Sequence, residues 1–279
     1  MLVGDAGVNG VRMLAVYGVA SAVVIAVALV RRVGVLRGGG VGRPPTPSEL
    51  AYLNGGPARA VHSALAGLRA FRAIDTGAPR TLRAIGPHPP GATELEQAVY
   101  DAADRHRPAH GLRDDPGVAA ALVALRADLV RAGWLASAEQ RRRARSGGSL
   151  VLGLALLGGL RIPASVEGSR PGLVLLTIAT AAVGAALLVV GPRTIAGRRA
   201  VAAARRVHPV APIVPWSGGH RASADSTATP PAIGVALYGT AALWAADPVF
   251  AAEAGIERFP TGTASYGYGG AFESTVSTG

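Results

Sequence analysis

Cysteine and lysine are both absent from this chain of 279 residues. Without cysteine the protein has no disulfide bridge, no thiolate zinc cluster and no cysteine nucleophile. Without lysine, the glycine runs at 38–40 and 55–56 lack the residue that a phosphate-binding loop needs, so we interpret them as a linker and a helix stop. All 28 basic residues are arginine, against 17 Asp and Glu. This bias is typical of GC-rich coding, so the net charge of +11 is only partly a functional signal.

Charged residues are scarce too, at 16%, and the mean hydropathy of +0.33 is too apolar for a purely soluble chain. Residues 11–30 carry one charge, Arg12, and are long enough at ~1.5 Å per residue to cross a ~30 Å hydrocarbon core. Arginines follow this run, whereas the positive flank of a cleavable signal peptide precedes its apolar run. We therefore favour an uncleaved anchor over a signal peptide. Residues 172–190 form a second uncharged run.

The distribution of arginine decides between two and three membrane spans. Residues 149–160 are apolar, but a run of 12 is more common in core helices and half-spans. Eighteen arginines lie in 31–148, seven in 193–279 and three elsewhere, and a third span puts the first two groups on one side. Because arginine near span ends marks the cytoplasmic side, the sequence predicts three spans. The N-terminus is then outside, the segment 46–140 and the C-terminus are cytoplasmic, and Arg161 reaches the outer interface.

The segment 46–140 has the start and stop signals of a helical insert. Two capping boxes, in which a threonine and a glutamate three residues later cap each other's backbone, pair Thr46 with Glu49 and Thr93 with Glu96. Further signals are the Asn54-Gly55-Gly56 stop, the Pro57 restart, the Pro108 stop and the Asp115-Pro116 start.

Apolar stripes complete the interpretation of the insert. The last helix has the stripe Val118, Leu122, Leu125 and Leu129. The helix from Pro57 is predicted to bury the side with Val61, Ala64, Leu65, Leu68 and Phe71 and to expose the side with Arg59, His62, Ser63 and Arg69. Between the helices, 73–85 has turn residues between short apolar pieces and predicts a small hairpin or wing.

The fold class predicted is an all-α membrane protein with about three transmembrane helices, a small helical insert whose element order is compatible with a winged helix, and a disordered C-terminal tail. The stretch 232–246 is too short for an easy crossing, so we favour an interfacial or reentrant helix over a fourth span. The chain divides into an anchor (1–31), a linker (32–45), the helical insert (46–140), a transmembrane hairpin (149–191), a basic juxtamembrane helix (192–208), a second linker (209–231), the apolar interfacial or reentrant helix (232–258) and the tail (259–279).

Several short motifs resemble those of a family of uncharacterised actinobacterial membrane proteins that carry a conserved domain next to low-complexity tails rich in Gly and Cys. The motifs are 49–57 (ELAYLNGGP), 132–135 (AGWL), 169–172 (SRPG), 193–198 (RTIAGR) and 235–239 (VALYG). The resemblance covers roughly 46–256, and its most specific part is ELAYL-x-GGP. It implies architecture and no catalytic residue. Some members are encoded near iron-dependent peptide-modifying enzymes, but the tail here has Gly and Tyr without cysteine.

No catalytic, cofactor-binding or metal-ligating residue is predicted. His106 and His110 are four apart, but Pro108 breaks the helix that would align them. The carboxylates of Glu94, Glu96, Asp101 and Asp104 are interpreted as a solvated helix face and a favourable first turn, and those of Asp114 and Asp115 as helix capping. A close-packed helix face is predicted from the small residues Thr177, Thr180, Ala181 and Gly184.

These observations favour a plasma-membrane protein that is not an enzyme, takes no cofactor, and serves as a scaffold or protein-interaction module. Its expected partners are membrane lipids and a protein. The alternative is a membrane component, or a substrate, of a peptide-modification and export system. Sequence-specific binding of nucleic acid is not expected, because the predicted exposed face of the helix from Pro57 offers only Arg59, Arg69 and a few polar neighbours.

Overall fold

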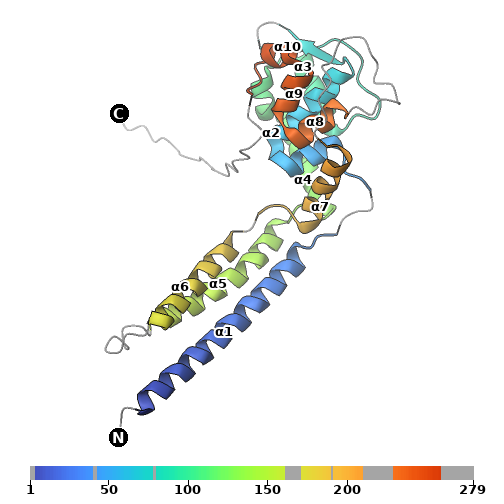
Figure 1. The fold of residues 1–279 in the computed structure, drawn as a ribbon. Helices are drawn as coiled ribbons and strands as arrows, with labels where there is room; N and C mark the ends of the chain where they lie inside the picture. The colour runs from blue at the N-terminus through green and yellow to red at the C-terminus, as the bar shows by residue number, and fades with distance from the viewer. Residues whose placement is uncertain are drawn as a thin grey trace, which may run out of the picture. The chain divides into compact units, whose positions relative to one another are not determined.

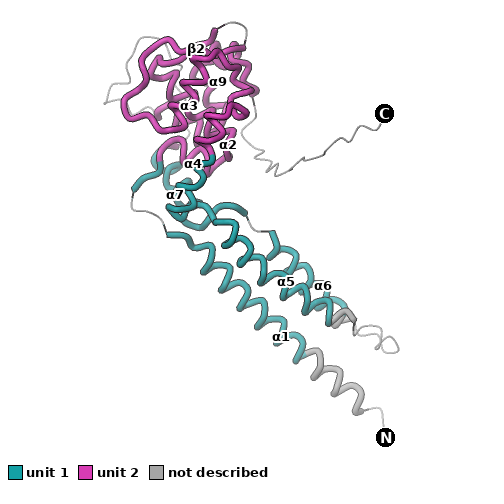
Figure 2. The backbone as a smooth tube through the Cα atoms, turned by 180° about the vertical axis from the view of Figure 1, so that it is seen from behind, with its two compact units in different colours: residues 1–45, 123–207 teal, residues 46–122, 208–279 magenta. Residues whose placement is uncertain are grey.

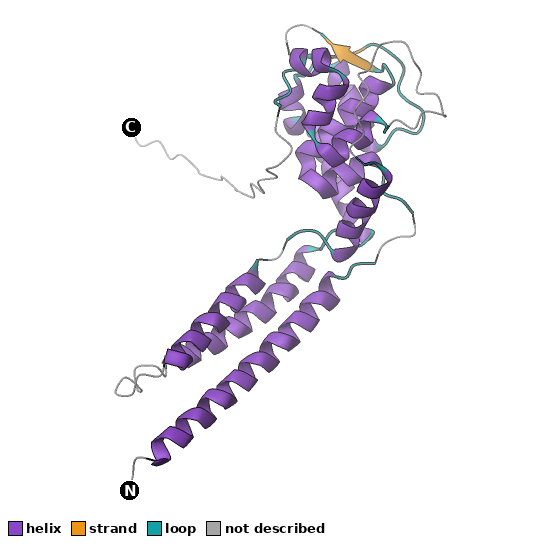
Figure 3. Cartoon of the chain, in the orientation of Figure 1, coloured by secondary structure: helices purple, strands orange, loops and turns teal. Residues whose placement is uncertain are grey.

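The computed structural model describes residues 4–39, 43–77, 80–160, 171–189, 191–209 and 229–258. Helices dominate these residues, and the described part of the chain contains one two-stranded sheet (Figure 3), so the helical fold class is confirmed. The chain forms two compact units (Figure 2). Unit 1 comprises residues 1–45 and 123–207, and unit 2 comprises residues 46–122 and 208–279. The predicted disordered tail at 259–279 and Arg161 lie outside the described residues, as does most of the predicted linker 209–231.

Three long helices of unit 1 pack side by side: α1 (Gly4–Leu36), α5 (Ala138–Leu160) and α6 (Pro171–Leu188) (Figure 1). The hydroxyl of Tyr17 donates to the Leu154 carbonyl at 3.3 Å, while a Cβ placed on Gly147 would lie 3.1 Å from that of Ala28. Helix α5 is therefore antiparallel to α1. The fourth helix of the unit, α7 (Ile195–Val207), is the predicted basic helix.

Among the described residues, one helix is long and apolar enough to cross a membrane, α1 over Ala15–Leu36 with a mean hydropathy of 2.1. A signal sequence near an N-terminus passes the same test. The apolar part of α6, Val174–Leu188, is shorter, and α5 starts at Ala138 rather than near 149. No proline separates the arginines at 141–145 from the apolar run, so the helix can include both. The glycines at 147 and 148 between them fit tightly against neighbouring helices. Three spans remain a prediction.

Unit 2 begins with α2 (Pro47–Ala70), and both predicted capping boxes form, at Thr46 and at Thr93. The predicted stop within α2 is a kink at Gly56, whose φ of 75° favours glycine. The predicted hairpin is also present, with β1 (Ile74–Thr76) antiparallel to β2 (Leu82–Ala84). The remaining helices of this region are α3 (Glu94–Asp104), the 3₁₀ helix η1 (Ala109–Asp114) and α4 (Pro116–Arg131), which continues into unit 1.

The segment 232–258 differs from the predicted interfacial or reentrant helix. It forms three short helices, α8 (Pro231–Tyr238), α9 (Thr240–Ala246) and α10 (Pro248–Glu253). Gly239, with a φ of 78°, separates the first two. Helix α8 packs along α2 in unit 2, so the segment belongs with the predicted insert rather than standing apart from it. In turn, residues 123–140, predicted as the end of the insert, group with unit 1.

Candidate functional site

Most of the side chains buried among α1, α5 and α6 are small or polar, although Val151 and Leu187 are buried there as well. Ser21 is 2% exposed and Thr180 is 3% exposed. A Cβ on Gly184 would lie 3.1 Å from the backbone nitrogen of Leu152, and one on Gly148 would lie 3.1 Å from the Gly184 carbonyl oxygen. The backbones of α5 and α6 thus approach closely where both carry glycine. This confirms the predicted close-packed face of α6.

The outward faces of the same bundle carry the large apolar side chains. Val16 and Val30 of α1 are 70% and 72% exposed, and Leu156 of α5 is 68% exposed. The other exposed members include Val19, Val23 and Val27 on α1, Leu150 and Leu157 on α5, and Leu175 and Ile178 on α6. A helical unit that buries mostly small residues and exposes most of its large apolar ones differs from the usual arrangement of a soluble protein.

Arginines gather at one end of this bundle. Helix α1 ends there and α5 begins there, while α6 ends beside them: the Arg32 guanidinium donates to the carbonyls of Leu187 and Val189, each at 2.7 Å. These two carbonyls are at the C-terminus of α6, where they lack helical partners. The ranges 31–45, 135–148 and 191–208 meet at this end and contain thirteen arginines but one carboxylate, that of Glu139. We call this region the arginine end.

The backbone at the arginine end is held by direct hydrogen bonds. Buried Thr194, the residue before α7, donates to the Gly133 carbonyl at 2.8 Å and accepts the Gly197 amide at 3.1 Å. The Ala196 amide donates to the Arg37 carbonyl at 3.2 Å. Gly38, with a φ of 63°, leaves no room for a Cβ, which would lie 2.2 Å from the Gly133 carbonyl oxygen. The start of α7 is therefore fixed to the end of α1.

The histidines and carboxylates considered as possible catalytic or metal-binding residues do not lie together in one site. His106 has a φ of 57° and its Nδ1 bonds the Asp104 carbonyl at 2.9 Å, while His110 is exposed on η1. Glu96 closes the capping box at the start of α3. Within the described ranges no three His, Asp or Glu side chains are grouped so as to hold a metal ion.

Asp115 caps α4 as predicted and is buried with its charge compensated. Its Oδ1 accepts the Gly117 amide at 3.0 Å, and Arg105 Nη2 donates to both carboxylate oxygens. Burial by itself raises the pKa of this carboxyl, but the bonds from Arg105, Gly117 and Val118 together lower the pKa below its ordinary value. The carboxylate is accordingly structural.

The titrating residue that sequence reasoning missed is His62 of α2, which was predicted to lie on an exposed face. The helix from Pro57 was predicted to expose Ser63 and to bury Phe71, and both predictions are wrong: Ser63 is 0% exposed because α8 covers it, and Phe71 is 66% exposed. Arg59 and Arg69, predicted on the same exposed side, are partly buried. His62 is partly buried. Burial, and then the charges of Arg113 and Arg59, lower its pKa to about 4. The one sequence feature that pointed to burial of this face of α2 was the apolar segment 232–246, which needs a helix to pack against.

We expect the free energy of unfolding of unit 2 to decrease as the pH is lowered, because of His62. Its pKa of about 4 lies below the ordinary histidine value of 6.5, so between these values the unfolded state binds more protons. Stability is full above 6.5 and decreases as the pH falls toward 4. At pH 5 the free energy of unfolding should be about 2 kcal/mol lower than at pH 8, or about 30-fold in hydrogen-exchange protection of α2.

The matched variants for this pH test are His62→Gln, which should remove the pH dependence, and His110→Gln, which alters an exposed histidine and should retain it. Protection factors of α2 peptides in the full chain, corrected for intrinsic exchange, provide the measurement. A wild-type protein with equal protection at pH 5 and pH 8 would contradict the prediction.

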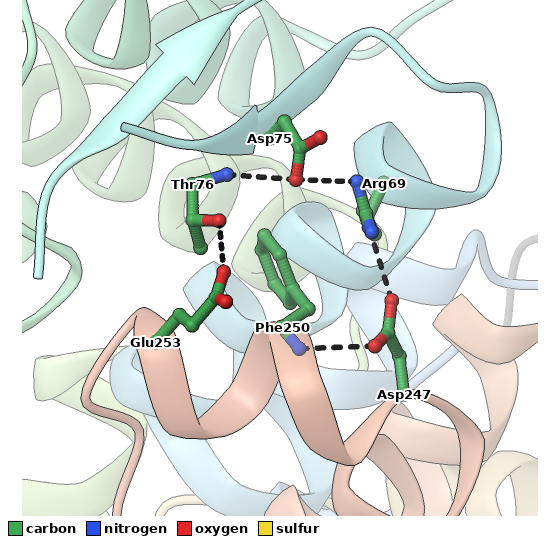
Figure 4. Close-up of polar contacts among 6 residues, drawn as sticks. All are labelled: Arg69, Asp75, Thr76, Asp247, Phe250 and Glu253. Atoms are coloured by element: carbon green, nitrogen blue, oxygen red, sulfur yellow. Dashed lines mark hydrogen bonds and ion pairs between the residues drawn. The ribbon is translucent and has the colours of Figure 1, made fainter. Parts of the chain in front are cut away.

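A polar network joins the hairpin to the C-terminal helices (Figure 4). Arg69 pairs with Asp75 of β1 at 2.6 Å and with Asp247 at 3.0 Å, and its guanidinium carbon lies 5.0 Å from the centre of the Phe250 ring. Asp247 also caps α10 by accepting the Phe250 amide at 3.0 Å. Every carboxylate in the drawing has a structural partner, so we assign the network to folding.

Three large apolar side chains are exposed around the hairpin of unit 2. Phe71 follows α2 directly, the Ile85 amide donates to the Ala73 carbonyl beside it, and Val249 is on α10, which contacts β1. Their exposed fractions are 66%, 47% and 63%. We call these three residues the hairpin patch. Neighbouring exposed apolar side chains on a folded domain are candidates for protein interaction, whereas single ones are common on any protein surface.

Comparisons of the chain with models of protein families, with curated proteins and with solved structures found no match. The family resemblance of 46–256 therefore stays a prediction, and the functional argument depends on the geometry of the two units.

Proposed function

We propose that the protein is an integral protein of the plasma membrane in which α1, α5 and α6 cross the bilayer. The observation that carries the proposal is the packing of this bundle, which buries Ser21, Thr180 and the glycines beside Val151 and Leu187 and leaves most of its large apolar side chains exposed. This arrangement is unfavourable in water but favourable in a bilayer, because lipid solvates the large apolar side chains while small residues let the helices pack closely. The apolar stretches of α5 and α6 are short, and the arginines beside them extend to the headgroups.

The proposed topology places the N-terminus outside and unit 2 in the cytoplasm. It is supported by the thirteen arginines of the arginine end, which collect where all three helices meet the same side of the bilayer. We expect reporter fusions after Ser137, Gly168 and Gly218 to report inside, outside and inside. A protein in which only α1 crosses would give the same side for all three fusions. An outside signal at Gly218 would contradict the three-span arrangement.

We further propose that unit 2 acts as a scaffold or protein-interaction module and not as an enzyme. Among its described carboxylates, those of Glu96 and Asp115 cap helices and that of Asp247 pairs with Arg69, and its exposed apolar side chains include the hairpin patch. The module is tethered to the membrane through residues 32–45 and the end of α4, so a protein bound to the patch would be held at the membrane surface.

Site-specific photocrosslinking in cells tests the interaction module. A photoreactive phenylalanine replaces Phe71, which is aromatic and exposed, and the control places it at exposed Gln97 on α3. We expect a discrete higher-mass product at position 71 that is lost when Ile85 and Val249 are replaced with serine. Products of equal yield at both positions, or none at position 71, would contradict the assignment of the patch.

A further inference from the structure

The helix α7 presents a single basic face. It contains Arg198, Arg199, Arg205 and Arg206, all exposed, and no acidic residue. At 3.6 residues per turn these four positions fall within an arc of about 120°. Gly197 and Val201, by contrast, are buried. A helix with one buried side and a continuous cationic side is built to meet an anionic surface.

The position of α7 in unit 1 determines which surface it meets. Its first turn is bonded to the end of α1 through the Ala196 amide and the Arg37 carbonyl, and it follows α6 after a short link. The exposed apolar side chains of the bundle extend close to this point along the chain. Val30 precedes Arg37 by seven residues and is 72% exposed, and Val189 precedes Ile195 by six and is 75% exposed. If the bundle crosses the membrane, α7 begins at the level of the lipid headgroups.

Charge complementarity selects the type of lipid. The arginine end has thirteen arginines and one carboxylate, and Glu139 is paired with Arg143. Guanidinium groups bind phosphate oxygens with two parallel hydrogen bonds. In a zwitterionic headgroup the negative charge of the phosphate is partly neutralised by the cation of the same headgroup. A headgroup with net negative charge leaves the attraction uncompensated.

We propose that the basic face of α7, together with Arg142 and Arg145 of α5, is a binding surface for the headgroups of anionic phospholipids in the cytoplasmic leaflet. The inference rests on the proposed membrane topology and adds a lipid selectivity to it. It implies that the membrane position of the chain depends on the lipid composition around it.

The test measures lipid binding to the full chain purified in detergent micelles. Native mass spectrometry gives apparent dissociation constants for phosphatidylglycerol and for phosphatidylcholine of the same acyl chains. We expect tighter binding of phosphatidylglycerol, and we expect the triple variant Arg198→Gln, Arg199→Gln, Arg206→Gln to weaken it by about 100-fold, at roughly fivefold per arginine. The matched control replaces exposed Arg72, Arg83 and Arg113 of unit 2 with glutamine and should bind as the wild type does.

Three results would overturn the inference: equal binding of the two lipids by the wild type, equal losses in the triple variant and in its control, or displacement of phosphatidylglycerol by a DNA duplex at equal phosphate concentration. The last would assign the face to nucleic acid. Alkaline extraction of native membranes is done on the same variants and reports on membrane integration alone. A chain released by alkali contradicts the proposed function, whereas a retained chain without lipid preference contradicts only this inference.

Discussion

Replacing Phe250 with alanine is expected to lower the free energy of unfolding of unit 2 by about 4 kcal/mol, which is the usual cost of removing a buried phenyl ring. Phe250 is 1% exposed and is among the largest fully buried side chains of the described residues. Its ring lies under the Arg69 guanidinium, which joins α2 to β1 and to the cap of α10 (Figure 4). The substitution therefore leaves a cavity and removes the surface on which this arginine rests.

Hydrogen exchange in the full chain measures this effect. Peptides of α9 and α10 should lose about 1000-fold in protection, which corresponds to ~4 kcal/mol. The matched variant Phe250→Leu retains most of the volume but not the aromatic face, and it should cost about 1 kcal/mol. A loss of less than tenfold in the alanine variant would show that α10 is not part of the cooperative core of unit 2.

The local signals of the insert could be predicted from sequence because each depends on neighbours in the chain. The capping box at Thr46 needs only Glu49, and the kink needs only Gly56 and Pro57. The apolar stripe of α4 is similar, since Val118, Leu122 and Leu129 are buried while Leu125 is partly buried. Interactions between residues close together in the chain were thus sufficient to predict the helices α2, α3 and α4.

The pairing of α2 with α8 could not be predicted in this way, because the two helices are far apart in the chain. Ser63 donates to the Ala232 carbonyl across 169 positions, and nothing near Ser63 indicates that partner. The length of 232–246 suggested an interfacial helix, whereas Gly239 breaks the segment into pieces that unit 2 buries. The same contact hides the face of α2 that was assigned to solvent.

The candidate sites also differ in whether they depend on residues close together in the chain or far apart. The small-residue face of α6 was predicted because Thr180 and Gly184 share one side of a single helix. The arginines at 31–37, 141–145 and 193–206 share one end of unit 1. The sequence predicted this only through the three-span arrangement, in which consecutive helices are antiparallel. The role of Arg32 in capping α6 needed coordinates, because its acceptor carbonyls are about 155 residues further along the chain.

Asn54 of α2 is expected to be one of the costliest polar residues of unit 2 to replace. Its Nδ2 donates to the carbonyls of Ala236 at 3.0 Å and of Leu237 at 2.8 Å, and the residue is 5% exposed. These carbonyls are in the last turn of α8, which Gly239 ends, so the helix itself leaves them without amide partners. Within α2, Gly56 thus provides the kink and Asn54 caps the helix that packs along it.

Asn54→Ala should therefore lower the free energy of unfolding by about 3 kcal/mol, because two buried carbonyls lose their donor. The matched variant Ser63→Ala removes a bond to the Ala232 carbonyl, which lies in the first turn of α8 and has an amide partner within the helix, so it should cost only about 1 kcal/mol. Protection of α8 amides should fall about 100-fold in the first variant and about fivefold in the second. Equal losses in the two variants would mean that Asn54 contributes one ordinary hydrogen bond, and that Gly239 rather than the Asn54 amide determines where α8 ends.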